Sequence, residues 1–253
     1  LTSIGGSAFY DCRSLTSLNL PKDITAIKDS TFYTCEKLAS INLPEGLKTI
    51  GNSAFMQCYK LTSINLPEGL TSIGGSAFYD CRSLTNISFP DGLTTIQDST
   101  FMYCSKLTSI SLPEGLTTIG GNAFYNCGNI ANITIPNSVT HIGAGALKGV
   151  TGNARINCNI PDQMSDGSGW FSGTLFSEVV FGEGVTSVGR SAFYGCNSLT
   201  SATLSQSISS IGSSSFYGCS NLASINLPEG LMSIGEAAFY DCQSLTNIIL
   251  PKA

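Results

Sequence analysis

The stretch LTSIGGSAFYDCRSLT, residues 1–16, occurs a second time without a single change at residues 70–85. The starts of the two copies, Leu1 and Leu70, are separated by three steps of 23, and the chain of 253 residues is eleven such steps. A fixed period of this length is typical of solenoids, in which each repeat is one structural unit that stacks on the next. Positions within the repeat are therefore numbered 1 to 23 from Leu1.

Most copies share the pattern L-T-S-I-G-x-S-A-F-Y-x-C-x-S-L-T-S-I-x-L-P-E-G. Its apolar positions are 1, 4, 9, 12, 15, 18 and 20, a spacing that neither a helix nor a strand explains alone. Positions 15 to 20 predict a short strand with positions 18 and 20 pointing inward, and the proline at position 21 ends it because it has no N–H for a ladder. Positions 1 to 4 predict a second extended piece. The Ser-Ala-Phe segment predicts one turn of α or 3₁₀ helix, capped by the serine at position 7.

One repeat buries too few apolar side chains to offset the conformational entropy that is lost when its chain is ordered. We therefore expect stability to come from stacking, with equivalent strands about 4.8 Å apart and identical side chains in continuous columns.

The motif L-x-x-I-x-L-P-x-x-L-x-x-I-x-x-x-A-F-x-x-C resembles the leucine-rich repeat of the BspA-like (Treponema pallidum) type, and it covers essentially the whole chain. The resemblance implies an α/β fold: a right-handed leucine-rich-repeat solenoid with a parallel β-sheet on one face and short α or 3₁₀ turns on the other. It also implies a secreted or cell-surface protein of a bacterium or protist, involved in adhesion to host matrix, cells or other microbes.

Charged residues make up 11 % of the chain and the net charge is −5, so we expect no nucleic-acid partner. No apolar run approaches the roughly 18 residues of a membrane span, which predicts no membrane insertion. The sequence begins and ends in mid-pattern without polar capping repeats, so we expect a single solenoid over residues 1–253 that is a fragment of a longer protein, and a monomer.

Cysteine recurs at position 12, where Val150 and Gly173 stand in two copies. Side chains stacked in register keep their Cβ atoms near 4.8 Å, longer than a disulfide prefers, so we predict reduced, buried thiols; a metal or redox role is the alternative. Cys158, outside the series, falls on strand position 20 by strict counting and is expected in the core. The nine members of the column are Cys12, Cys35, Cys58, Cys81, Cys104, Cys127, Cys196, Cys219 and Cys242.

Two further columns have an alternative interpretation. Tyrosines at position 10 either shield the core with wet hydroxyls or stack on sugar or protein. Acidic residues at position 22 are either solvated edge charges or ligands of a cation such as Ca²⁺. The position 10 residues are Tyr10, Tyr33, Tyr79, Tyr125, Tyr194, Tyr217 and Tyr240, with Met56, Met102 and Phe171 between them; those of position 22 are Glu45, Glu68, Asp91, Glu114, Glu183 and Glu229.

The pattern breaks at residues 148–182, where residues 161–169 predict a flexible bulge and Trp170 falls on the phenylalanine position. Outward strand positions 17 and 19 carry small polar groups elsewhere, but Arg155 and Glu178 appear together at position 17 here. Non-repeating segments often hold the specificity of solenoids. The candidate binding residues are therefore Arg155, Glu178, Trp170 and Phe171; decay of an unselected copy is the alternative.

No nucleophile elbow, phosphate loop or zinc-ligand spacing occurs, and the lone histidine, His141, is expected at the surface. We therefore expect no enzyme and no cofactor. The expected function is an interaction module that binds protein or glycan through an extended surface. A passive spacer, favoured by the near-identity of the copies, and an intracellular scaffold are the alternatives.

Overall fold

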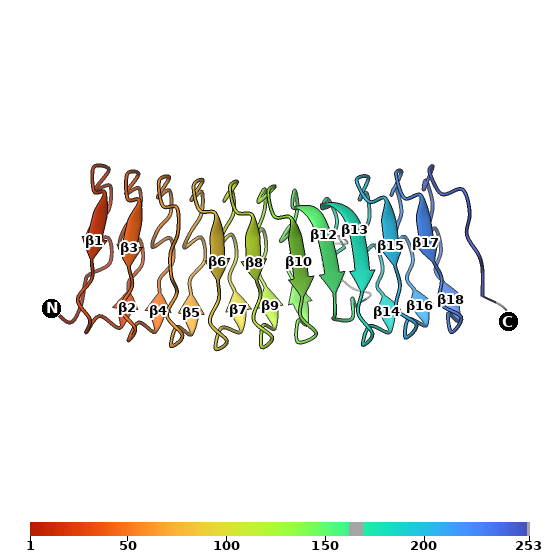
Figure 1. The fold of residues 1–253 in the computed structure, drawn as a ribbon, viewed down its shortest axis with the longest axis horizontal. Helices are drawn as coiled ribbons and strands as arrows, with labels where there is room; N and C mark the ends of the chain where they lie inside the picture. The colour runs from red at the N-terminus through yellow and green to blue at the C-terminus, as the bar shows by residue number, and fades with distance from the viewer. Residues whose placement is uncertain (162–168, 252–253) are drawn as a thin grey trace.

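The computed structural model describes residues 1–161 and 169–251. These residues form an elongated stack of layers, with the two termini at opposite ends (Figure 1). Every strand pairing within them is parallel, and in regular repeats the partners lie one full repeat apart, as Ser17 and Ser40 do. The predicted solenoid of stacked parallel strands is confirmed.

The main ladder uses positions 17 to 19 of the regular repeats, which is shorter than the predicted 15 to 20. In Ser40–Asn42 the outer two residues are exposed and Ile41 is buried, so the predicted alternation holds. We call the outward side chains of this ladder the strand face. Its strands are β1 (Ser17–Asn19), β3 (Ser40–Asn42), β6 (Asn86–Ser88), β8 (Ser109–Ser111), β10 (Asn132–Ile135), β12 (Thr151–Ile156), β13 (Leu175–Phe181), β15 (Ser201–Thr203) and β17 (Ser224–Asn226).

A second ladder forms at positions 3 and 4, as the second extended piece predicted. Its two-residue strands bury the isoleucine or valine of position 4 in nearly every layer. They are β2 (Ala26–Ile27), β4 (Thr49–Ile50), β5 (Ser72–Ile73), β7 (Thr95–Ile96), β9 (Thr118–Ile119), β11 (His141–Ile142), β14 (Ser187–Val188), β16 (Ser210–Ile211) and β18 (Ser233–Ile234).

The predicted helical turn is wrong, because the described part of the chain has no α or 3₁₀ helix. Positions 5 to 12 are consecutive tight turns whose N–H groups alternate between two kinds of partner. The Tyr79 N–H donates to the Ser76 carbonyl three residues back, at 3.0 Å, whereas the Phe78 N–H donates to Thr100 of the next repeat, at 2.9 Å. Half of this arc is therefore bonded between layers, which an internally bonded helix about 10 Å wide would not allow at this layer spacing.

Left-handed backbone at positions 7 and 11 produces these turns. Ser76 has φ +55° and Asp80 has φ +61°, so the serine at position 7 lies inside a turn and caps no helix. Gly145 and Gly195 occupy positions 7 and 11 in other copies with φ +64° and +69°. The repeat thus accepts either glycine or a strained non-glycine residue, mostly polar but once Ala237, at these two positions.

The core consists of the predicted columns. Phenylalanine rings of successive repeats stack face to face, with Phe78 5.3 Å from Phe55 and 5.2 Å from Phe101 between ring centroids. This spacing on the turn side is close to the roughly 4.8 Å between parallel strands on the opposite side. The nearly equal spacings explain why the stack is straight (Figure 1).

The irregular repeats change register twice. Asn132 pairs with Asn153, and Asn153 in turn pairs with Glu178. The first step is two residues shorter than a full repeat and the second two residues longer, so regular spacing returns at β15. In this region the chain runs as long strands, with six residues in β12 and seven in β13, instead of the usual three.

Strict counting is therefore wrong for several residues between 153 and 174. Ile156, aligned with Ile135 and Phe181, takes the strand position assigned to Cys158, although Cys158 is buried as predicted. Phe171, rather than Trp170, lies in the phenylalanine column, where its ring stacks on Phe193 at 5.0 Å. Thr174, rather than Gly173, takes the cysteine position, and its hydroxyl lies 3.4 Å from the Cys196 sulfur.

Candidate functional site

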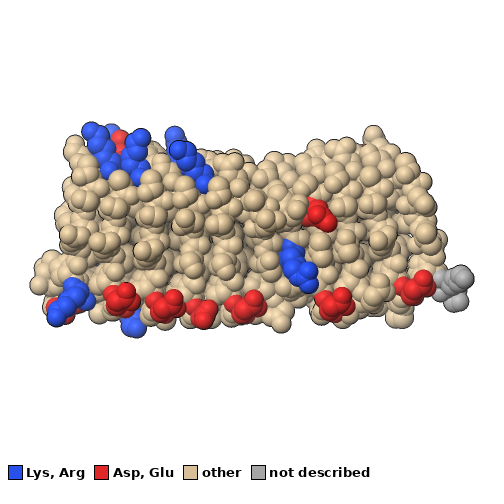
Figure 2. Space-filling model, viewed as in Figure 1, with Lys and Arg blue, Asp and Glu red and all other residues tan. Residues whose placement is uncertain are grey.

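Arg155 and Glu178 both lie on the strand face, on the adjacent strands β12 and β13. Arg155 aligns with Thr134 and Val180 and therefore belongs to the position 19 row, whereas Glu178 belongs to the position 17 row. The expectation that both share position 17 is wrong, because β12 begins two residues early. No ion pair joins them within the described residues, so two separate charges stand on a face that otherwise has few (Figure 2).

Trp170 and Phe171 are core residues. Trp170 is 3 % exposed and Phe171 is fully buried, so neither ring can contact a ligand at the surface. Their assignment to a binding site is wrong: the phenylalanine position predicted for Trp170 is itself in the core, and the shift in register moves Phe171 into that buried column. The predicted bulge falls at residues 161–169, most of which lie outside the described residues.

A row of basic side chains lies along one long edge of the strand face, and the sequence patterns above did not identify it. Figure 2 shows Lys and Arg side chains gathered at the upper edge near the N-terminal end, and acidic side chains along the lower edge. The row alternates between positions 13 and 14, so it does not appear as one column in the sequence. Its members are Arg13, Lys37, Lys60, Arg82 and Lys106, which come from the first five repeats.

The lower edge contains the predicted acidic column at position 22. All of its side chains are exposed, Glu68 and Asp91 among them. No group of three metal-ligating side chains occurs within residues 1–161 and 169–251. The solvated-edge interpretation fits these charges.

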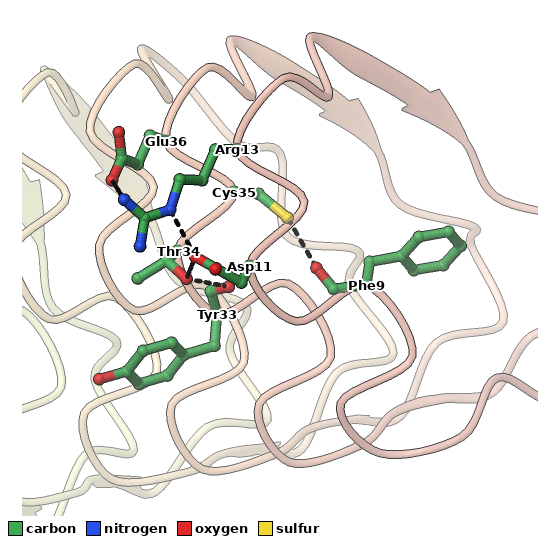
Figure 3. A network of polar contacts seen from close by, with 7 residues as sticks. All are labelled: Phe9, Asp11, Arg13, Tyr33, Thr34, Cys35 and Glu36. Atoms are coloured by element: carbon green, nitrogen blue, oxygen red, sulfur yellow. Dashed lines mark hydrogen bonds and ion pairs between the residues drawn. The ribbon is translucent and has the colours of Figure 1, made fainter.

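Arg13 takes part in a polar network at the first repeat (Figure 3). Its Nε donates to Asp11 Oδ1 at 2.6 Å, and its Nη1 lies 3.5 Å from Glu36 Oε1. The Thr34 hydroxyl donates to the same Asp11 oxygen at 3.0 Å. The hydrogen bond from Arg13 lowers the pKa of Asp11, but the Arg13 and Asp11 side chains are exposed and screened by water, so their ion pair adds little stability.

Arg82 stands in the identical stretch three repeats later, with different neighbours. Its Nε and Nη2 donate to the two carboxylate oxygens of Asp80 at 2.6 and 2.8 Å. Its guanidinium also lies 4.9 Å from the centre of the Tyr59 ring, a cation–π contact. Where Glu36 faces Arg13, the next repeat places Ser105 beside Arg82.

The tyrosine row changes its packing along the solenoid. At the two ends the rings stack in parallel: Tyr10 on Tyr33 at 4.7 Å and Tyr194 on Tyr217 at 4.8 Å. In the middle of the solenoid, Tyr103, which lies at position 11, packs edge-on between the rings of Tyr79 and Tyr125. A hollow, here called the tyrosine hollow, opens beside it; it is lined by Gln57, Tyr79, Asp80, Arg82, Tyr103, Ser105 and Asn126.

The cysteine column is structural. All ten cysteines are free, and eight of them are buried. The Cys104 thiol donates to the Phe78 carbonyl of the preceding repeat at 3.2 Å, and the other copies repeat this bond. Burial raises the pKa of Cys127 to about 12 and that of Cys196 to about 11, so both remain protonated and unreactive at neutral pH.

No helix in the described part of the chain is long and apolar enough to cross a membrane.

Comparisons with known proteins show what the chain is similar to. No curated protein is significantly similar in sequence. The structure resembles a leucine-rich repeat protein from Bacteroides ovatus (27 % identity, TM-score 0.57), covering 98 % of this chain and 82 % of that one.

It also resembles a leucine rich cell surface protein from Faecalibacterium prausnitzii, with 26 % identity and a TM-score of 0.59, over 97 % of this chain and 82 % of that one. A leucine-rich repeat protein from Eubacterium ventriosum, 22 % identical with a TM-score of 0.50, shares the fold over 97 % of this chain and 81 % of that one. The model of the BspA type leucine rich repeat region matches residues 1–104, 71–168 and 162–253. The chain therefore belongs to the BspA-type leucine-rich repeat family.

Proposed function

We propose that the chain is a non-catalytic interaction module at the cell surface, which binds a host or microbial protein or glycan through the strand face. The observation that carries the proposal is the pair of charges, Arg155 and Glu178, on long adjacent strands of an otherwise flat, small and polar surface. Charged groups at the centre of such a surface fix the position of a partner, whereas small hydroxyls and amides alone anchor it weakly.

Three further observations support this proposal. The family model that matches the chain describes a leucine-rich repeat region and names no enzyme. A similar structure belongs to a cell surface protein. The layered fold presents its outward side chains at regular spacing over the whole length of the chain, which suits contact with an extended partner.

The test is binding of the chain to immobilised matrix proteins and to a glycan array. The variants take residues that the same rows already contain: Arg155→Thr, as at Thr134, and Glu178→Ser, as at Ser201. The control is Lys48→Thr, which removes a charge outside the strand face at a position where Thr71 stands in the next copy.

We expect the double variant to lose at least about tenfold in affinity for whichever partner binds, with Lys48→Thr within twofold. A partner held equally well by the double variant would overturn the assignment to the strand face. A chain that binds nothing on either array would favour a passive spacer. Antibody labelling of intact cells tests the surface location, which internal staining alone would contradict.

A further inference from the structure

We propose that the tyrosine hollow binds an acidic sugar, a uronate unit of a glycan. The inference rests on the proposed function only in that it too assigns ligand binding to the chain, because the hollow lies on a different surface from Arg155 and Glu178.

The hollow has the size and lining of a small-ligand site. Its volume is 440 Å³, within the roughly 300 to 1,000 Å³ of such sites, which combine aromatic walls with a few polar groups. Two tyrosines supply the aromatic surface. Gln57, Ser105 and Asn126 supply amide and hydroxyl groups that can both donate and accept hydrogen bonds, as sugar hydroxyls require.

The tyrosines are arranged differently here from elsewhere in the row. The ring of Tyr103 is nearly perpendicular to Tyr79, with centroids 5.6 Å apart and planes at 86°, and to Tyr125, at 5.7 Å and 82°. Parallel stacking, as between Tyr10 and Tyr33, covers the ring faces. Edge-on packing leaves ring faces uncovered, and such a face is a platform for the C–H face of a sugar ring.

Arg82 provides a preorganised donor for a carboxylate. Two of its nitrogens are held by Asp80, whose side chain is only 8 % exposed, and its plane is held over Tyr59. Its Nη1 has no hydrogen-bond partner within residues 1–161 and 169–251, and the Arg82 side chain is 63 % exposed. The donor is fixed before a ligand arrives, which lowers the entropic cost of binding.

The local charge favours an anion even though the whole chain is negative. Asp80 neutralises Arg82, but Lys60 and Lys106 stand at position 14 of the repeats on either side, and both are exposed. A single carboxylate per sugar matches this sparse positive charge. A nucleic acid or a strongly sulfated chain would meet too few cations for the counterion release that drives polyanion binding.

The first repeat is a natural control. Arg13 has the same sixteen-residue surroundings in sequence and the same bond to its aspartate, but Glu36 lies 3.5 Å from its Nη1. The nitrogen that is open at Arg82 thus already faces a carboxylate at Arg13. The structure therefore distinguishes two arginines that the sequence makes equivalent.

The experiment measures binding of trigalacturonate and its fully methylated ester to the intact chain by NMR titration and calorimetry. The variants are Arg82→Gln, the control Arg13→Gln, and Tyr103→Asn, which introduces the residue that Asn126 provides at the same repeat position. We expect Arg82→Gln to lose at least about tenfold in affinity, as does removal of a charge-assisted hydrogen bond. Tyr103→Asn should lose about fivefold or more, and Arg13→Gln should stay within twofold.

The ester should bind at least about tenfold more weakly than the acid, because it keeps the ring and removes the charge. Equal losses in Arg13→Gln and Arg82→Gln, or equal binding of acid and ester, would overturn the proposal. Binding of polyglutamate or oligonucleotides as tight as that of trigalacturonate would also overturn it, since it would show charge attraction without sugar recognition.

Failure here is distinguishable from failure of the strand-face proposal. The Arg155→Thr, Glu178→Ser double variant should bind trigalacturonate as the wild type does. If the wild-type chain does not bind trigalacturonate, but the double variant loses binding to a partner found on the arrays, only the proposal for the tyrosine hollow is overturned.

Discussion

Phe9 and Phe78 lie in identical sixteen-residue stretches, so the same substitution at both tests the effect of neighbouring repeats alone. Phe78 is fully buried, with stacked rings on both sides at 5.3 and 5.2 Å. Phe→Ala at such a site costs about 3 to 5 kcal/mol in the free energy of unfolding. Phe9 is half-buried and stacks on one ring only, at 5.3 Å, so its loss costs about 1 to 2 kcal/mol.

The assay is urea denaturation of Phe9→Ala and Phe78→Ala, followed by far-ultraviolet circular dichroism and by the fluorescence of Trp170. We expect Phe78→Ala to lower the midpoint for both signals. Phe9→Ala should shift the Trp170 signal little, because the damage stays near the first repeat. Equal destabilisation by the two variants would refute the reasoning, since local sequence rather than stacking would then determine stability.

Three more predictions concern the turns and the thiols. Gly195→Val should lower the free energy of unfolding by about 1 to 2 kcal/mol, because the φ of Gly195 is +69°. An added side chain there would meet nothing within 4 Å, so the backbone strain is the only cost. Gly184→Val, which is equally open but has no positive φ, is the control, and equal effects of the two variants in thermal melts would contradict the strain. Alkali should unfold the chain between about pH 9 and 11. Burial raises the pKa of Cys196 to about 11, so its stabilising contribution is intact below the unfolded thiol value of about 8.5 and is lost above it, by about 1.4 kcal/mol per pH unit for each such thiol. A chain still folded at pH 11 would contradict this. In the native state at pH 8, the exposed Cys12 should react with a thiol reagent well before the buried cysteines, and uniform labelling in mass spectra would argue against the column.

Periodicity predicted most of this fold because each layer meets a copy of itself. Position 18 of the strand and the phenylalanine column follow directly from residues recurring at one spacing, as Ile41 and Phe78 show. The turn arc could not be predicted in the same way. Its N–H groups can bond three residues back or to the next layer, and the layer spacing, which is a property of the stack, decides between the two.

The candidate site was harder to predict than the fold. Counting by 23 placed Trp170 in the phenylalanine column, but the longer step from β12 to β13 leaves the register one residue later than strict counting there, which gives that place to Phe171. The repeat pattern did not predict the basic row along the edge, because its residues occupy position 13 in some repeats and position 14 in others. The tyrosine hollow depends on Tyr103 standing next to Tyr79, a pairing between repeats that no single-copy pattern contains.

The central claim is that each repeat gains its stability from the repeats beside it. The most direct measurement is the free energy of unfolding of a truncation series ending after whole repeats, at residues 46, 92 and 138, by circular dichroism in urea. The fragment 1–46 should be unfolded, because about three or more repeats are needed for a stable stack, and stability should rise with each added pair of repeats. A folded 1–46, or a stability that does not grow from 1–92 to 1–138, would contradict the claim.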